Sequence, residues 1–252
     1  MTLNNTRILI TRPAHQVDEF SRLIEKYGGI PVKFPVLEIK PLDFKESLKE
    51  ELKKSYRWIV FTSVNGVRFS FKHVKDRFTP EIKICAIGPA TARAIEEMGG
   101  RVDFVPDKYV SYEIARLLPI KEEDRVLLLR AKIAPPDLRE ELIHKGAEVV
   151  EIPVYDTVEK IYPPEEVQEK IFPVPDFITF TSSSTFRAFI KNLENSGIEP
   201  QEIFREGKIA VIGPVTAQTV RSSGFEPDVI AKEHTLEGLL KAISAFLKEV
   251  RV

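Results

Sequence analysis

The sequence predicts an α/β fold made of two similar domains, each built on a parallel sheet. Short, nearly continuous apolar runs alternate with helical patterns, and a long internal repeat covers most of the chain. Continuous apolar runs are typical of parallel strands that helices cover on both faces. Alternation of strand and helix implies right-handed crossovers between the strands.

The individual elements follow from the apolar pattern. The apolar runs predict strands at residues 8–11, 58–62, 83–87, 125–129, 177–181 and 208–212. Between the first two runs, Phe20, Leu23, Ile24 and Tyr27 recur at three- and four-residue spacing, which predicts an amphipathic helix over residues 17–26.

The repeat has the order A–B–A′–B′. Residues 8–36 (A) align with 126–154 (A′) at an offset of 118, and residues 61–100 (B) align with 180–225 (B′) at offsets of 119 and then 125. A period of this length predicts two domains and not a solenoid. From the repeat alone, A can pair with B and A′ with B′, with one crossing at residues 119–124. Alternatively, B pairs with A′ and A with B′, and the chain then crosses near residues 36–44 and 151–161.

Composition excludes several classes of protein. The 252 residues carry 37 Lys and Arg against 38 Asp and Glu, a balance that argues against a nucleic-acid binder. A single cysteine, Cys85, excludes a disulfide framework and a thiolate metal cluster. The first residues are too polar for a signal peptide, and no run approaches the ~20 apolar residues of a membrane span. These features predict a soluble, cytoplasmic protein.

The sequence also lacks the common cofactor motifs. It contains no G-x-G-x-x-G and no P-loop, and its four histidines show no metal-ligand spacing. We therefore expect no metal, no cofactor and no covalent catalysis.

Four predicted strand ends lead into turns with small hydroxyl residues. These turns are Thr62-Ser63, Thr181-Ser182-Ser183-Ser184, and the two loops that contain Thr91 and Thr216. Ligands of open α/β sheets bind at the carboxyl ends of strands. Each hydroxyl taken alone is best interpreted as a helix N-cap. Four such turns in a two-fold related pattern make an anion-binding surface a competing interpretation.

Tyr155 breaks the symmetry of the repeat, because the first copy has Leu37 at the same position. A tyrosine phenol is protonated at neutral pH and can donate a proton to an oxygen leaving group. On the pattern alone, an aromatic side chain that packs across a strand pair is the favoured interpretation.

Seven segments, in the same order along the chain, resemble the uroporphyrinogen-III synthase family. They are ILITRP (8–13), FTSVNGV (61–67), AIGPATARAIEEMG (86–99), IPVYDT (152–157), ITFTSSSTF (178–186), AVIGPVTAQTV (210–220) and TLEGLLKAI (235–243). The resemblance favours the interleaved assembly, because the family has two α/β domains joined by a two-stranded connector with both termini in one domain. It implies one domain of residues 1–34 and 162–252, a connector of residues 35–45 and 150–161, and a second domain of residues 46–149.

The resemblance further implies an activity. Enzymes of this family close linear hydroxymethylbilane to uroporphyrinogen III, without a cofactor, in the biosynthesis of haem, sirohaem and cobalamin. They are lyases that remove water and invert ring D through a spirocyclic intermediate. We expect hydroxymethylbilane as the small-molecule partner, a transient hand-over from hydroxymethylbilane synthase, a monomer, and no nucleic-acid or membrane partner.

The resemblance carries over to particular residues. Tyr155, in the VYDT motif, is expected to assist departure of the hydroxyl, which reverses the interpretation from the pattern alone. The expected substrate contacts are Thr62, Ser63, Thr91, Thr181, Ser182, Ser183, Thr216, Arg12, Arg139 and Lys208, although structural salt bridges also suit the three basic residues. Two loops depart from the family, because Val64-Asn65 follows the first Thr-Ser and the second loop reads Ser-Ser-Ser-Thr.

One rival comes from another class of protein. A non-enzymatic cytoplasmic binding protein, closing its two domains on a small anionic ligand, would also suit two similar α/β lobes. Turnover distinguishes the two hypotheses, because a binding protein consumes nothing.

Overall fold

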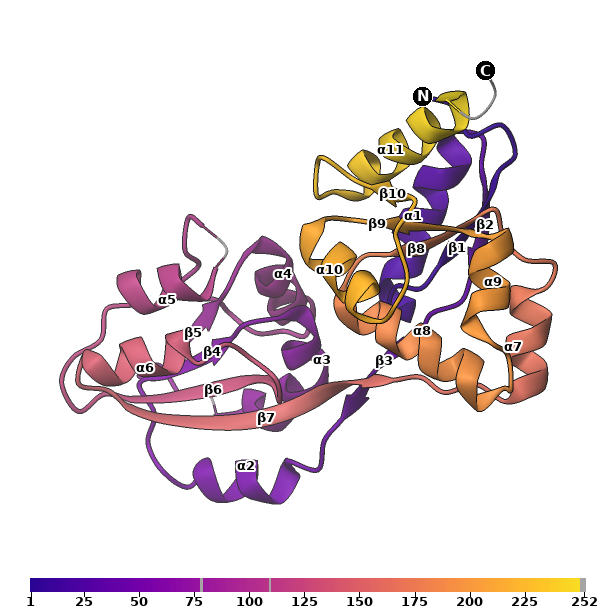
Figure 1. Cartoon of the computed structure of the whole chain (residues 1–252). Coiled ribbons are helices and arrows are strands. Elements are labelled where there is room, and N and C mark those ends of the chain that lie inside the picture. The colour runs from indigo at the N-terminus through magenta and orange to yellow at the C-terminus, as the bar shows by residue number, and fades with distance from the viewer. Residues whose placement is uncertain (78, 109, 250–252) are drawn as a thin grey trace. The chain divides into compact units, whose positions relative to one another are not determined.

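The computed structural model describes residues 1–77, 79–108 and 110–249, so residues 78, 109 and 250–252 of the two expected domains lie outside the described part. Strands and helices alternate along the chain (Figure 1). The strands are β1 (Arg7–Ile10), β2 (Ile30–Lys33), β3 (Leu37–Pro41), β4 (Trp58–Phe61), β5 (Lys83–Ala86), β6 (Arg125–Ala131), β7 (Glu148–Glu159), β8 (Phe177–Phe180), β9 (Lys208–Val211) and β10 (Val229–Ile230). All six strands expected from the apolar runs are present, and their ends lie within two residues of the expected ends.

Helices follow most of these strands. They are α1 (Ala14–Lys26), α2 (Lys45–Glu51), α3 (Val64–Val74), α4 (Pro89–Glu97), α5 (Ser111–Leu117), α6 (Asp137–His144), α7 (Pro164–Ile171), α8 (Ser183–Asn195), α9 (Pro200–Glu206), α10 (Pro214–Ser222) and α11 (Leu236–Glu249). The predicted helix over residues 17–26 is confirmed as part of α1. Among the described residues, no helix is long and apolar enough to cross a membrane.

The chain forms two compact units. Unit 1 contains residues Met1–Glu38 and Val158–Val252, and unit 2 contains residues Ile39–Thr157. The chain passes between the units within β3 and within β7, and these two strands are neighbours in the sheet of unit 2. The two segments expected to form a connector, residues 35–45 and 150–161, therefore contain β3 and most of β7, which belong to the unit 2 sheet.

Each unit is built on a five-stranded sheet. Unit 1 has the order β10-β9-β8-β1-β2, and unit 2 has the order β5-β4-β6-β7-β3. The pairs β1–β2, β1–β8, β8–β9, β9–β10, β4–β5, β4–β6 and β6–β7 are parallel. The predicted fold class, α/β with two similar parallel sheets, is confirmed.

The internal repeat explains why the sheets are similar. In unit 1, β8 ends at the first residue of segment B′ and β9 lies within that segment, while β1 and β2 come from segment A. In unit 2, β4 ends at the first residue of segment B and β5 lies within that segment, while β6 and the first part of β7 come from segment A′. Each sheet thus combines the second half of one repeat with the first half of the other, in the same spatial order.

Helices cover both faces of each sheet, which is why the central strands, such as β4, are mostly apolar and buried. In β4, Ile59 and Phe61 pack with α3 and α4, while Trp58 and Val60 pack with α5 and α6. In unit 1, α8 and α10 cover one face and α1 and α11 cover the other. Loss of water from both faces is the main favourable contribution to stability of such a sheet.

We propose that unit 2 folds independently, and a truncation series tests this prediction. A fragment of residues 39–157 keeps three strands of its sheet whole and most of β3 and β7, and it should unfold cooperatively. A fragment of residues 46–149 lacks β3 and nearly all of β7, so we expect it to be less stable. A fragment of residues 1–122 divides both sheets and should show no cooperative transition by circular dichroism. Cooperative unfolding of 1–122 alone would contradict the proposal.

Candidate active site

Most of the predicted site residues lie at the carboxyl edge of a sheet, near the point where the direction of the chain crossovers reverses. In unit 2, β4 leads into α3 on one face and its neighbour β6 leads into α6 on the opposite face. In unit 1, β1 and β8 diverge in the same way into α1 and α8. Loops that leave neighbouring parallel strands toward opposite faces leave a crevice at the carboxyl edge, where open α/β folds bind ligands.

In unit 2 this edge brings Ser63 and Tyr155 together. Ser63 directly precedes α3 and is its N-cap, with extended backbone angles and an Oγ that accepts the Gly66 N–H at 3.0 Å. The same Oγ lies 3.0 Å from the Tyr155 hydroxyl, and either group can donate that hydrogen bond. The capping function expected of a single hydroxyl is therefore confirmed for Ser63, and the contact with the phenol is an addition to it.

A β-bulge directs the side chain of Tyr155 toward Ser63. In the pairing of β6 with β7, Arg130 of β6 lies opposite Pro153 of β7. The next residue of β6, Ala131, lies opposite Tyr155 and not Val154. The extra residue, Val154, ends the alternation of side chains, so Val154 and Tyr155 both pack in the core beside α3. Bulges are rare in parallel pairs and are frequent beside active sites, where they redirect a side chain.

The ring of Tyr155 is held by packing. Tyr155 is only 8% exposed, and the ring of Phe69 from α3 lies 6.0 Å away between centroids. The Tyr155 carbonyl oxygen also accepts the Lys132 N–H at 2.8 Å. Packing and backbone bonding together leave the phenol few alternative positions, and such restriction favours a precise reaction geometry.

Gly66 allows α3 to approach the sheet. A Cβ atom at this position would lie 2.9 Å from the backbone oxygen of Leu129 in β6 and 3.3 Å from Ser63 Oγ. Because a backbone oxygen cannot move aside as a flexible side chain can, any larger residue must displace the first turn of α3. Gly66 thus fixes the distance between the N-cap serine and the sheet.

Thr62 and an ion pair adjoin Ser63 and Tyr155 along the chain. Thr62 is half-buried between β4 and Ser63. Lys132 Nζ lies 3.6 Å from Asp156 Oδ2, next to Tyr155, with Lys132 mostly exposed and Asp156 mostly buried. Because the Lys132 ammonium is mostly exposed, this pair contributes little to stability, but it places a cation beside the edge that carries Tyr155.

The two Gly-Pro loops place buried threonines in the first turns of α4 and α10. Gly88 and Gly213 are the N-cap residues, and neither helix has a side-chain cap among the described residues. Thr91 and Thr216 are 3% and 4% exposed. These threonines are therefore not N-caps, in contrast to Ser63.

In unit 1 the serine loop caps α8 and Arg12 lies after β1. Ser182 is the N-cap and forms a capping box with Thr185, while Ser183 bonds Thr219 through their hydroxyls at 2.6 Å. Thr181 directly precedes this cap and is half-buried. Arg12 bonds the neutral amide oxygen of Gln16 at 2.6 and 3.1 Å. Burial lowers the pKa of the Arg12 guanidinium, opposed by the nearby carboxylate of Glu19.

Two of the predicted basic residues are placed differently. Lys208 begins β9, at the amino edge of the sheet, and its Nζ lies 3.4 Å from Asp228 Oδ1. The structure therefore does not bring Lys208 to the edge that carries Thr216 and Ser182. Arg139 is exposed in the first turn of α6, the helix that follows the carboxyl end of β6. It lies at the same edge of the sheet as Ser63.

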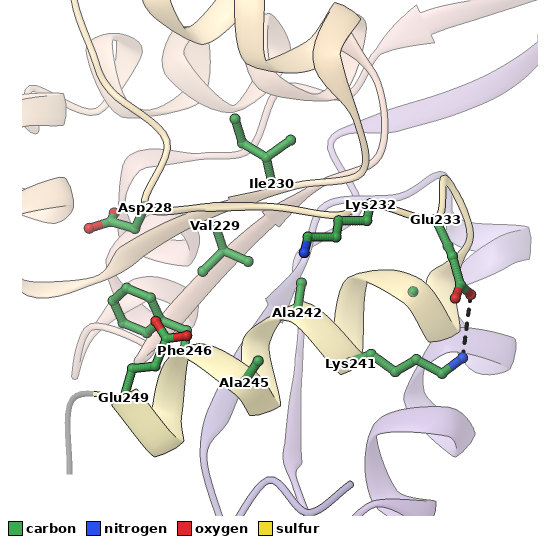
Figure 2. Close-up of a pocket in the computed structure, with 11 residues that line it drawn as sticks. Asp228, Val229, Ile230, Lys232, Glu233, Lys241, Ala242, Ala245, Phe246 and Glu249 are labelled. Atoms are coloured by element: carbon green, nitrogen blue, oxygen red, sulfur yellow. Dashed lines mark hydrogen bonds and ion pairs between the residues drawn. The ribbon is translucent and has the colours of Figure 1, made fainter. Parts of the chain in front are cut away.

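A separate cavity of about 390 Å³ lies between β10 and α11 (Figure 2). Its lining includes Lys232, Glu233, Lys241 and Phe246, and Lys241 forms an ion pair with Glu233. None of its eleven lining residues is among the predicted site residues. We therefore do not assign the reaction to this cavity.

Comparison with known proteins identifies the family. Residues 18–241 match the family model described as "Uroporphyrinogen-III synthase HemD". The match spans most of the chain and includes both units. The chain belongs to the uroporphyrinogen-III synthase family.

Relatives of full length support the assignment to the uroporphyrinogen-III synthase family. A protein named "Putative uroporphyrinogen-III synthase" from Methanocaldococcus jannaschii is 32% identical, over 96% of this chain and 99% of its own length. The "Uroporphyrinogen-III synthase" of Synechococcus elongatus is 27% identical, over 96% of both chains.

Solved structures of uroporphyrinogen-III synthases share the fold. The enzyme from Helicobacter pylori superposes with a TM-score of 0.58 at 22% identity, covering 95% of this chain and 99% of its own. A mutant of the enzyme from Thermus thermophilus gives a TM-score of 0.55 at 20% identity, covering 97% and 99%.

Three residues at the carboxyl edge of the unit 2 sheet were not predicted from the sequence. They are Gly66, Lys132 and Arg130, the last a buried arginine near the end of β6. The alignment of Arg130 with Arg12 in the repeat was a signal that could have identified it.

Proposed function

We propose that the protein is a uroporphyrinogen-III synthase of the lyase class. It closes hydroxymethylbilane to uroporphyrinogen III with loss of water and inversion of ring D. Family membership supports this function, and the observation that carries it is the Tyr155–Ser63 hydrogen bond at the carboxyl edge of the unit 2 sheet. A binding protein that catalyses no reaction would not need a phenol held in this way.

In the proposed reaction, Tyr155 assists departure of the terminal hydroxyl. The C–O bond breaks with its electron pair on oxygen, which takes the phenol proton and leaves as water. The substituted carbon of ring D then attacks the resulting cation and forms the spirocyclic intermediate. Rearrangement and ring closure release one proton from carbon, which balances the proton that Tyr155 supplied. General acid assistance of this kind typically contributes about 10²–10⁴ in rate.

Ser63 and α3 stabilise the phenolate that this step creates. When Ser63 donates to the Tyr155 oxygen, the phenol hydrogen is left for the substrate. The Gly66 N–H donates in turn to Ser63 Oγ, so the first turn of α3 supports the developing negative charge through two linked hydrogen bonds.

The substrate carries eight carboxylates, and the proposed contacts suit them. Hydroxyls of Thr62, Thr91, Thr181, Ser182, Ser183 and Thr216 can donate to carboxylate oxygens, and Arg12 and Arg139 can pair with them. Lys208 remains a prediction that its position at the amino edge of β9 does not favour. A monomeric state, a cytoplasmic location and hand-over from hydroxymethylbilane synthase also remain predictions.

A coupled assay tests the proposed function directly. The purified chain, without added metal or nucleotide, should convert hydroxymethylbilane to the type III isomer. Chromatography separates the type I product of spontaneous closure from the type III product. Formation of type I product alone, at the rate without enzyme, would refute the proposal.

A pair of serine variants separates chemistry from capping. Ser63→Ala and Ser182→Ala each remove an N-cap, so each should lower the free energy of unfolding by about 1 kcal/mol. Only Ser63 also bonds Tyr155, so Ser63→Ala should lower kcat by a further factor of about 10, the equivalent of one hydrogen bond of ~1.4 kcal/mol. Denaturant unfolding and steady-state kinetics measure the two effects. A wild-type kcat in Ser63→Ala would show that Ser63 has no role beyond capping.

A further inference from the structure

Arg130 is a buried charge that the proposed reaction does not use. It is the next-to-last residue of β6, and its side chain is 2% exposed. Burying a guanidinium costs several kcal/mol unless good partners offset the loss of water. A buried arginine beside a candidate active site therefore calls for a specific role.

The guanidinium of Arg130 connects two segments that adjoin Tyr155. Its Nη2 donates to the carbonyl oxygen of Pro135, in the loop between β6 and α6, at 2.6 Å. Its Nε lies 3.2 Å from Glu151 Oε1 on β7. Among the described residues no acceptor is aligned with the Nε–H, so the contact with Glu151 is an ion pair and not a hydrogen bond.

Both segments adjoin the backbone that positions the Tyr155 phenol. Glu151 precedes the bulge of β7, and the register changes between Arg130 and Ala131. The loop that contains Pro135 begins at Lys132, whose N–H donates to the Tyr155 carbonyl oxygen at 2.8 Å. The Arg130 side chain thus holds the strand before the bulge and the loop that bonds to the residue after it.

We propose that Arg130 is a positioning residue, which fixes the β7 bulge and the β6–α6 loop so that the Tyr155 phenol stays aligned with the leaving hydroxyl. The inference rests on the proposed function. The guanidinium combines a hydrogen bond from Nη2 to Pro135 with an ion pair at Nε to Glu151, and the single ammonium of a lysine cannot occupy both positions. Arg130→Lys should therefore keep the charge and lose the alignment.

The same two strands provide a matched control. Arg125, at the start of β6, pairs with Glu148 of β7 at 2.7 Å, and these two residues are opposite each other in the register. This pair is also a cross-strand Arg–Glu contact, but it lies at the amino edge of the sheet, away from Tyr155. Arg125→Lys reports the cost of weakening such a pair without any effect on the bulge.

Kinetics and a double-mutant cycle test the proposal in the full-length protein. Arg130→Lys should lower kcat for type III product about 10-fold with KM within twofold of wild type, whereas Arg125→Lys should leave kcat unchanged. In a Tyr155→Phe background, Arg130→Lys should have less than a twofold effect, because it acts through the phenol. An unchanged kcat in Arg130→Lys, or a full 10-fold effect in the Tyr155→Phe background, would overturn the proposal.

Amide exchange adds a test that needs no turnover. The Lys132 N–H should exchange about 10-fold faster in Arg130→Lys than in wild type or Arg125→Lys, and unchanged exchange would overturn the proposal. If Arg130→Lys does not fold, Glu151→Gln weakens the same contact and must give the same pattern. Absence of type III product from the wild-type protein would refute the proposed function, whereas an active wild type with unaffected variants would refute only the role of Arg130.

Discussion

Replacement of Tyr155 by Phe should lower kcat by about 10²–10⁴ while the protein remains folded. Phe keeps the ring that packs against Phe69 and in the core beside α3, and it loses only the hydroxyl that bonds Ser63. The free energy of unfolding should fall by only ~1 kcal/mol, the value of one hydrogen bond. Rates of type III formation, together with denaturant unfolding, give both quantities.

Tyr162→Phe is the matched control for this variant. Tyr162 is also a buried tyrosine whose hydroxyl donates a hydrogen bond, in its case to the carbonyl oxygen of Pro35 at 2.8 Å. Its loss should cost similar stability and leave kcat near wild type. If Tyr155→Phe turns over at the wild-type rate, Tyr155 serves only packing, and the mechanism proposed for departure of the hydroxyl is wrong.

Replacement of Gly66 by Ala should impair both stability and turnover. In an open helix this change stabilises by about 0.5–1 kcal/mol, but here the new Cβ would lie 2.9 Å from the Leu129 backbone oxygen. Overpacking against a rigid neighbour costs about 1–3 kcal/mol, so we expect net destabilisation. A displaced first turn of α3 also moves Ser63 away from Tyr155, and misplacement by about 1 Å can cost roughly 10² in kcat.

Arg68→Ala is the control for the glycine variant, because Arg68 is exposed on the same helix. It should change the free energy of unfolding by no more than about 0.5 kcal/mol and leave kcat unchanged. A Gly66→Ala protein that is more stable than wild type would show that α3 can move outward at no cost. The close approach would then have no functional meaning.

Several features of the fold were predictable because they depend on local pattern. The strands at Trp58–Phe61 and Phe177–Phe180 are buried on both faces, and nearly continuous apolar runs indicate such burial. The capping function of Ser63 and Ser182 likewise follows from a hydroxyl residue placed directly before a helix.

Other features depend on which segments become neighbours. The bulge at Val154 exists only in relation to β6, so no pattern within β7 reveals it. Gly66 matters because of an oxygen atom 63 residues later in the chain, at Leu129. Lys208 was expected near the substrate, but its place at the first residue of β9 puts it at the opposite edge from the loops.

The interleaved order of the repeats has a consequence for synthesis on the ribosome. Unit 2 is complete once residue 157 has emerged, whereas β1 and β2 must wait for β8, which follows later in the chain. At about 5–20 residues per second, the remaining 95 or so residues take roughly 5–20 s to synthesise. During that interval the apolar side chains of Ile8, Leu9 and Phe20 lack most of their native neighbours. The nascent N-terminal segment is therefore the part of this chain with the greatest need of a chaperone.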